Sequence, residues 1–164
     1  MEARAKVLGH AVHQMLIPYP LALLTTAIIF DVIHLMTDNP LWATIAFWMI
    51  AAGIIGGLAA ALFGVIDWTG IPRATRAKRI GVLHGTGNVI MVALFAVSWL
   101  LRRADPGDPS TVAIATSLVG GGLSLYTAWL GGELVDRLGV GVDDGANVNA
   151  PSSLSGRPAS ARSE

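Results

Sequence analysis

Four stretches of this sequence contain no lysine, arginine, aspartate or glutamate, and this absence limits the possible folds more than any other feature. The stretches are residues 7–30, 39–66, 80–101 and 109–132. Each exceeds the roughly 20 residues that a helix needs to cross a hydrocarbon core of about 30 Å. Inside lipid, backbone polar groups have no water to bond, so such stretches must be helical. The sequence therefore predicts an all-α fold, an integral membrane four-helix bundle.

The chain is expected to divide into a membrane domain and a polar tail. The four helices are expected at residues 17–35, 41–66, 80–101 and 112–134. The first apolar stretch has no clear small-residue cleavage site before Asp31, which favours a retained helix over a signal peptide. From Asp143 onward, glycine, alanine, asparagine, proline, serine and arginine dominate, and they bury too little apolar surface to offset the entropy of ordering. The sequence predicts a transmembrane domain over residues 1–142 and a disordered tail over residues 143–164.

An even number of helices places both termini on one side of the membrane, and basic residues indicate which side. The terminal side carries seven membrane-proximal basic residues: Arg4, Lys6, Arg73, Arg76, Lys78, Arg79 and Arg137. The opposite side has only Arg102 and Arg103. Since cytoplasmic loops carry an excess of lysine and arginine, both termini are expected in the cytoplasm of a bacterial-type cell. The chain is thus expected to be a multi-pass protein of the inner (plasma) membrane, in contact with the lipid bilayer.

Composition excludes several kinds of chemistry. The chain has no cysteine, which removes disulfides, iron–sulfur ligation, thiolate catalysis and covalent haem attachment. Its formal net charge of +0 gives no electrostatic case for a nucleic-acid partner. The sequence shows no nucleophile–base arrangement or phosphate-binding loop, so no enzymatic activity is assigned. The substrate and the oligomeric state stay open.

Small residues recur at helical spacing in the second and fourth stretches. Gly53, Gly57 and Ala61 lie four residues apart, and Gly121 and Ser124 belong to a similar series. Small side chains allow helix backbones to approach closely. We interpret these faces as packing surfaces and assign no chemistry to them.

Polar residues collect at the cytoplasmic ends of all four expected helices. Ionisable groups at membrane depth tend to face the bundle interior and mark functional sites. His84 and Asn88 are four residues apart and share one face of a helix. The candidate cofactor-binding residues are His10, His13, His84, Asn88, Asp67, Trp68, Trp129 and Glu133, and the candidate metal ligands are His13 and His84.

Two simpler interpretations stand beside this site. The cluster can be a structural hydrogen-bond network, with Asp67 and Glu133 reaching the headgroup region and pairing with nearby arginines. At the opposite face, plain ion pairing is the favoured interpretation. The residues concerned there are Asp31, His34, Asp38, Arg102 and Arg103.

Several motifs resemble the signatures of the domain of unknown function 2231 family of bacterial membrane proteins. They are GHAVHQMLIPYPL at residues 9–21, Asp31, GVIDW at residues 64–68, His84 with Asn88, and WLGGELV at residues 129–135 followed by Arg137, Gly139, Val140, Gly141 and Val142. The resemblance covers about residues 8–142. Some relatives join this module to a Rieske or cytochrome c-like domain, so the resemblance implies a role in electron transfer. In the family a proline tends to follow each leading histidine, whereas this chain has Ala11 and Gln14.

Three functions from different classes follow from these observations. The first is a b-type haem or metal-binding electron-transfer module with a redox partner protein. His84 and either His10 or His13 are its ligands, and Asn88, Asp67 or Glu133 orients them. The second is a small transporter or proton-relay protein that uses the same histidines and carboxylates as titrating groups. The third is a non-catalytic membrane assembly subunit.

Overall fold

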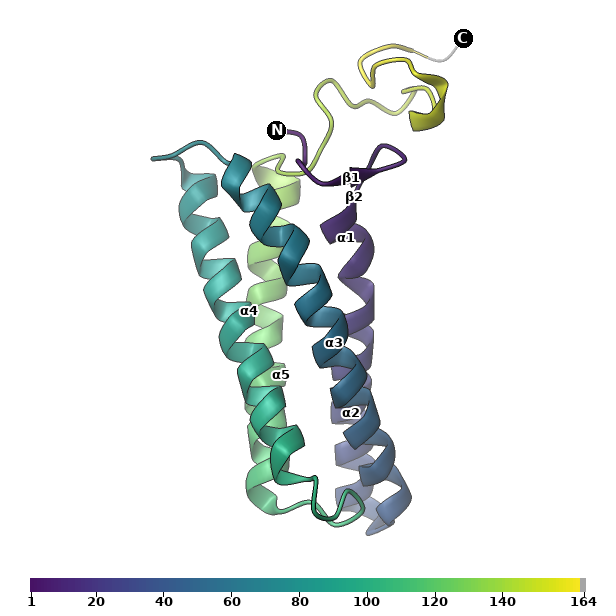
Figure 1. Cartoon of the computed structure of the whole chain (residues 1–164), viewed down its shortest axis with the longest axis vertical. Helices are drawn as coiled ribbons and strands as arrows, with labels where there is room; N and C mark the ends of the chain where they lie inside the picture. Colours follow the sequence, from purple (N-terminus) through teal and green to yellow (C-terminus); the bar gives the residue numbers. More distant parts are fainter. Residues whose placement is uncertain (163–164) are drawn as a thin grey trace.

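The computed structural model describes residues 1–162 and consists of four long helices lying side by side (Figure 1). The elements in chain order are β1 (Lys6–Val7), β2 (His10–Ala11), α1 (Val12–Leu16), α2 (Pro18–Thr37), α3 (Pro40–Gly70), α4 (Arg76–Leu101), α5 (Thr111–Gly132), the π-helix η1 (Glu133–Arg137) and the 3-10 helix η2 (Ser153–Ser155). The N-terminus and residues 143–162 of the tail lie at the same end of the molecule (Figure 1). The last two residues of the expected tail, Ser163 and Glu164, lie outside the described residues.

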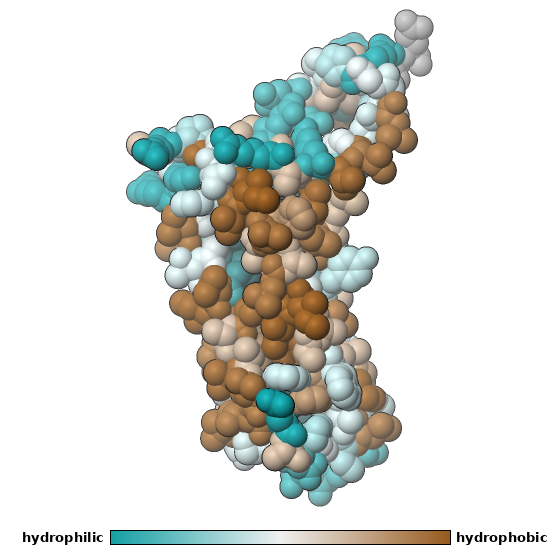
Figure 2. Space-filling view, in the orientation of Figure 1, coloured by the Kyte–Doolittle hydropathy of each residue, from teal (hydrophilic) through white to brown (hydrophobic). Residues whose placement is uncertain are grey.

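Within the described chain, four spans are long and apolar enough to cross a membrane, as the sequence predicts. They are Val12–Thr37, Pro40–Gly70, Arg76–Leu101 and Thr111–Arg137. Large apolar side chains remain exposed along all of them; Trp48, Ile55, Val89 and Leu125 are each at least 65% exposed. Figure 2 shows this apolar surface as a brown zone over the helices, with hydrophilic residues at both ends. A surface of this kind is unfavourable in water and suits contact with lipid chains.

The helices extend further than the charge-free stretches. α3 continues through Asp67 to Gly70, and α4 begins at Arg76 rather than at residue 80. A charge-free stretch shows which residues can lie in the hydrocarbon core. The helix itself can continue beyond that core, because its backbone hydrogen bonds do not depend on apolar side chains. The ends are capped locally: the Asn39, Thr75 and Ser110 side chains accept hydrogen bonds from the N–H groups of Leu41, Lys78 and Ala113, respectively.

α1 and α2 belong to one apolar span, Val12–Thr37, and Ile17 between them has right-handed helical backbone angles. Pro18 has no N–H to donate to α1, so the hydrogen-bond ladder has a gap there while the chain stays helical. A short antiparallel pair, β1 with β2, precedes α1. Its turn places Leu8 at φ 50° and Gly9 at φ 84°, which matches the left-handed geometry of a two-residue hairpin turn. The sequence analysis did not anticipate these strands.

Residues 1–11, here called the N-terminal strap, cross this same end of the bundle (Figure 1). The Met1 ammonium donates to the carbonyl oxygen of Gly139 at 3.0 Å, and the Gly141 N–H donates to the carbonyl oxygen of Met1 at 2.9 Å. The strap is thereby joined to the segment that follows α5.

The bundle core lies between two helical hairpins, α2 with α3 and α4 with α5. Leu24, Ala27, Ala46, Ile50, Met91 and Phe95 form one buried cluster that includes residues of both hairpins. Gly53 allows the close approach of α2, since a Cβ atom there would lie 2.5 Å from Cδ2 of Leu24. Towards the strap the hairpins leave a cavity, which is described below.

At the opposite end, one of the predicted ion pairs forms. Asp31 and Arg102 pair, and both side chains are fully buried. His34 instead donates from Nδ1 to the carbonyl oxygen of Asn39 at 3.1 Å. Arg103 lies over the ring of Trp99 at 5.5 Å from its centroid.

Candidate functional site

His13 lies on α1 and is fixed against α3. Its Nδ1 is 2.7 Å from the carbonyl oxygen of Ala60. Because a carbonyl oxygen only accepts, Nδ1 carries the hydrogen and donates it, and the lone pair of the ring is on Nε2. The ring packs on Gly64, where a Cβ atom would lie 2.8 Å from Cε1 of His13. Glycine at position 64 therefore makes the space for this imidazole.

His84 is fixed against α5 in the same manner. Its Nδ1 donates to the carbonyl oxygen of Thr127 at 2.9 Å, so its lone pair is also on Nε2. The ring lies beside Gly131, where a Cβ atom would be 3.2 Å from Cε1. Two glycines on different helices thus accept two imidazoles.

Asn88 lies one turn further along α4, on the same face as His84. Its Nδ2 donates to the carbonyl oxygen of His84 at 2.8 Å. The same nitrogen is 3.4 Å from Nδ1 and 3.3 Å from Nε2 of the ring. An atom nearly equidistant from both ring nitrogens cannot lie along the lone pair of either, so Asn88 leaves the Nε2 lone pair of His84 accessible.

The rings of His13 and His84 lie near each other at about right angles, in the interior between the hairpins. Their centroids are 6.4 Å apart, and the ring planes are 89° from parallel. Within residues 1–162, Nε2 of His13 has no hydrogen-bond partner.

Both histidines line a cavity of about 900 Å³. This volume lies within the range of roughly 300–1,000 Å³ found for ligand pockets. The walls are mostly apolar or small, and glycines are frequent among them: Gly57, Gly64, Gly81, Gly85, Gly131, Gly132 and Gly141. The cavity is thus wide, apolar and supplied with two imidazoles.

Asp67 and Trp68 also line this cavity, and each has structural contacts. Oδ1 of Asp67 accepts hydrogen bonds from the backbone N–H groups of Arg4 at 2.7 Å and Ala5 at 3.0 Å. The Trp68 indole packs against α4 at Gly81, and Nζ of Lys78 lies 3.6 Å from its ring centroid. Asp67 therefore joins α3 to the N-terminal strap.

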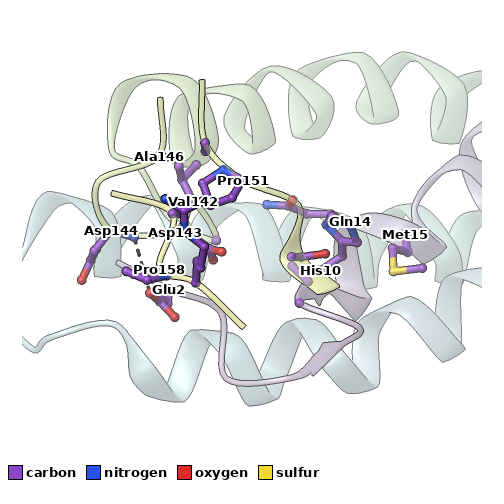
Figure 3. Close-up of a pocket in the computed structure, with 17 residues that line it drawn as sticks. Glu2, His10, Gln14, Met15, Val142, Asp143, Asp144, Ala146, Pro151 and Pro158 are labelled. Atoms are coloured by element: carbon purple, nitrogen blue, oxygen red, sulfur yellow. Dashed lines mark hydrogen bonds between the residues drawn. The ribbon is translucent and has the colours of Figure 1, made fainter. Parts of the chain in front are cut away.

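The other three sequence-predicted site residues lie elsewhere. His10, in β2, lines a separate surface pocket of about 700 Å³, where it lies beside Gln14 (Figure 3). Tail residues, among them Asp143 and Pro151, line another part of this pocket. Trp129 is 58% exposed and stacks with Tyr126 at 6.1 Å. Glu133 pairs with Arg76 at 2.5 Å. None of them lines the histidine cavity.

Sequence reasoning did not identify the groups that orient the imidazoles. The carbonyl oxygens of Ala60 and Thr127 belong to the backbone and leave no side-chain signature. Gly64 and Gly131 do leave one, since each glycine stands within a motif that the sequence analysis singled out. Their role as seats for imidazole rings becomes visible only when the helices are placed side by side.

A bare metal ion has no ligand set here. Across the described residues, no group of three or more His, Cys, Asp or Glu side chains is placed to hold one. Structural and catalytic ions are normally held by at least three protein ligands. The metal-ion form of the sequence hypothesis is therefore not supported by this geometry.

Four lipid-compatible helices around an apolar cavity define a multi-pass membrane protein. The family model described as predicted membrane protein (DUF2231) matches residues 9–144, so the chain belongs to this family and the resemblance noted in the sequence is confirmed. No curated protein matches the chain. No solved structure matches it either.

Proposed function

We propose that this protein binds one b-type haem between His13 and His84 and serves as an electron-transfer module of the membrane. The observation that carries the proposal is the pair of imidazoles, 6.4 Å apart by centroid, on one apolar cavity. A metal–imidazole bond is about 2 Å long and the ring centroid lies roughly 1 Å behind the bonding nitrogen, so two imidazoles that bound one iron could have centroids as much as about 6 Å apart. The observed separation agrees with this value.

The protonation of the two rings also supports the proposal. A histidine that binds metal through Nε2 usually donates its Nδ1–H to a carbonyl or carboxylate, which fixes the tautomer and the ring orientation. His13 does so to Ala60, and His84 does so to Thr127. A structural hydrogen-bond network does not require that both rings have the same tautomer and line the same cavity, whereas a shared ligand site does.

Two histidines suffice for haem although they do not suffice for a bare ion. The porphyrin supplies four nitrogens to the iron, so the protein adds only one or two axial ligands. A planar macrocycle needs open space beside the two imidazole rings. The glycines of the cavity walls leave such space because they have no side chains. The absence of cysteine requires that the haem be bound without covalent attachment.

The protein would supply binding, orientation and exclusion of water. When bound, haem iron exchanges single electrons. His13 and His84 would hold the iron, and apolar walls that include Leu24 and Met91 would keep water away. The strap covers the same end of the bundle, which we assign to the cytoplasmic side of an inner membrane from the basic-residue count. A redox partner protein would approach there.

The carboxylates of the proton-relay alternative are already engaged. Asp67 accepts from two backbone N–H groups, and Glu133 pairs with Arg76. A relay needs groups that are able to take up and release protons along a path. These contacts favour the haem proposal over the relay.

Absorption spectroscopy of the protein purified from haem-supplied cells tests the proposal. We expect one non-covalent haem per chain with the spectrum of a six-coordinate, low-spin b-type centre. His13→Ala and His84→Ala should each abolish that spectrum. His10→Ala and His34→Ala are matched controls and should retain it, since neither residue lines the cavity. A wild-type protein that takes up no haem, in cells or on addition of hemin, would overturn the proposal.

A further inference from the structure

Asp67 is a buried carboxylate that is not a ligand in the proposed haem site. Its exposed fraction is 8%, and no cationic side chain pairs with it among the described residues. A buried carboxylate without a counter-ion is costly unless hydrogen bonds compensate. The compensating donors are the Arg4 and Ala5 N–H groups of the N-terminal strap.

A short chain of hydrogen bonds leads from Asp67 to His13. The Ala5 N–H donates to Asp67, and the Ala5 carbonyl oxygen accepts from the Val12 N–H at 2.9 Å. Val12 is the first residue of α1, and His13 follows it directly. The peptide units of Ala5 therefore connect the carboxylate to the start of the helix that carries the imidazole.

Three residues on one face of α3 contribute to the position of His13. Ala60, Gly64 and Asp67 are separated by four and three residues, so they lie in line on one side of the helix. Ala60 accepts from Nδ1, Gly64 seats the ring, and Asp67 fixes the strap that leads into α1. α1 has no side-chain cap, and its C-terminal end continues through Ile17 into α2, so these contacts fix its N-terminal end, where His13 stands.

We propose that Asp67 is a positioning residue for the haem ligand His13, acting through the backbone of the N-terminal strap. The inference rests on the proposed haem function. Asp67 does not touch the iron; it fixes the strap, the strap fixes α1, and α1 sets the place of Nε2 of His13. His84 stands within the long helix α4 and needs no such support.

The test compares Asp67→Leu with Asp67→Asn. Leucine removes the acceptor, so the Arg4 and Ala5 N–H groups lose their partner and His13 is no longer held. Loss of groups that orient a metal ligand commonly weakens binding by about 10–100-fold, and we expect haem retention to fall by about that factor. The remaining haem should shift from low-spin to high-spin, since the His84 ligand stays and the His13 ligand leaves. Asparagine keeps an acceptor oxygen and should rescue the low-spin spectrum.

Two further variants separate positioning from general stability. Glu133→Gln changes another carboxylate at the same end of the bundle without touching the strap, and it should leave the spectrum unchanged. Gly64→Ala places a methyl group 2.8 Å from Cε1 of His13 and should reproduce the high-spin shift by a different route. An Asp67→Leu protein that keeps a low-spin spectrum would overturn the inference.

Amide hydrogen exchange provides a readout that does not depend on haem. Asp67→Leu should accelerate exchange at Ala5 and Val12 while the amides of α4 stay protected. Unchanged exchange at both positions would overturn the role of Asp67 even in a protein that binds haem normally. A haem-free wild type with accelerated exchange in Asp67→Leu would instead overturn the proposed function and support the strap mechanism alone.

Discussion

Asp31 and Arg102 form a bidentate ion pair in which both side chains are fully buried, 71 residues apart in the sequence. Nη1 donates to Oδ1 at 2.5 Å and Nη2 donates to Oδ2 at 2.7 Å. Ser98 accepts from Nε at 3.2 Å, and Ser117 donates to Oδ2 at 2.8 Å. The pair therefore connects α2 to the ends of α4 and α5, opposite the histidine cavity.

Removing one member of this pair should be strongly destabilising, because the other charge stays buried without a partner. For Asp31→Leu or Arg102→Leu alone, we expect the free energy of unfolding to fall by about 3–5 kcal/mol. The double variant Asp31→Leu/Arg102→Leu should recover most of that loss, since no charge remains buried. Thermal unfolding in detergent measures all three. Additive losses in the double variant would show that the two charges do not interact.

Close packing at Gly53 leads to a second prediction. A side chain at this position meets Leu24, whereas Gly122 has nothing within 4 Å of an added Cβ atom. Overpacking a core costs about 1–3 kcal/mol. We expect Gly53→Leu to lower the unfolding free energy by at least about 1 kcal/mol. Gly122→Leu is the matched control and should be neutral or stabilising, because leucine is the better helix former. Equal effects at both positions would show that α2 and α3 do not pack as described.

The orientation of the chain in the membrane is the third prediction, and the structure sharpens its basis. Arg102 is fully buried in its ion pair, so Arg103 is the basic residue left near the membrane at that end. Five of the seven basic residues at the terminal end are exposed, against one of the two at this end, so the fold keeps the excess of basic charge on the terminal side. A reporter that is active only in the periplasm should be silent when fused after Glu164 and active when inserted at Gly107. The reverse result would invert the topology without changing the helices.

The helices were predictable because lipid restricts composition so severely. Charge-free stretches longer than a bilayer is thick leave few alternatives, and all four spans follow from them. Arg102 shows the limit of this reasoning. The sequence analysis expected Arg102 to pair with an acidic residue such as Asp31, yet it still counted Arg102 as a charge on the water side, because only the folded bundle shows that both side chains are fully buried.

The candidate site was predictable in part for a related reason. His13 and His84 lie near the starts of the first and third spans. Because consecutive helices run antiparallel, the sequence indicates that both starts lie at the same end of the bundle. His10 is only three residues from His13, but it stands in β2 rather than on the helix, so it lines a different pocket. The N-terminal strap has no hydrophobic periodicity from which its structure could be predicted. Its anchor on Asp67 depends on backbone donors that no sequence pattern encodes.

Acid should loosen the N-terminal strap, and the ionic contacts of Lys6 give the reason. Lys6 donates to Glu2 at 2.8 Å and to Asp143 at 2.5 Å. The hydrogen bond with Lys6 lowers the pKa of Glu2 below its usual 4.5, and the hydrogen bond with Asp143, followed by that with Glu2, raises the pKa of Lys6 above its usual 10.5. The Glu2 contribution is present above pH 4.5 and is lost as pH falls through its lowered pKa. The Lys6 contribution is complete below pH 10.5 and is lost only as pH rises through its raised value.

Spin labels on cysteines introduced at the exposed positions Leu8 and Arg73 measure this effect, since the chain has no cysteine of its own. The distance distribution should stay narrow from pH 4.5 to pH 10.5 and broaden as the pH falls through the lowered pKa of Glu2, because protonated Glu2 no longer pairs with Lys6. Lys6→Met is the control: the labels should show a broader distribution at neutral pH and little further change in acid. A distribution that stays narrow in acid, or one that Lys6→Met leaves unaltered, would mean that the backbone contacts with Asp67 and Gly139 hold the strap without help from Lys6.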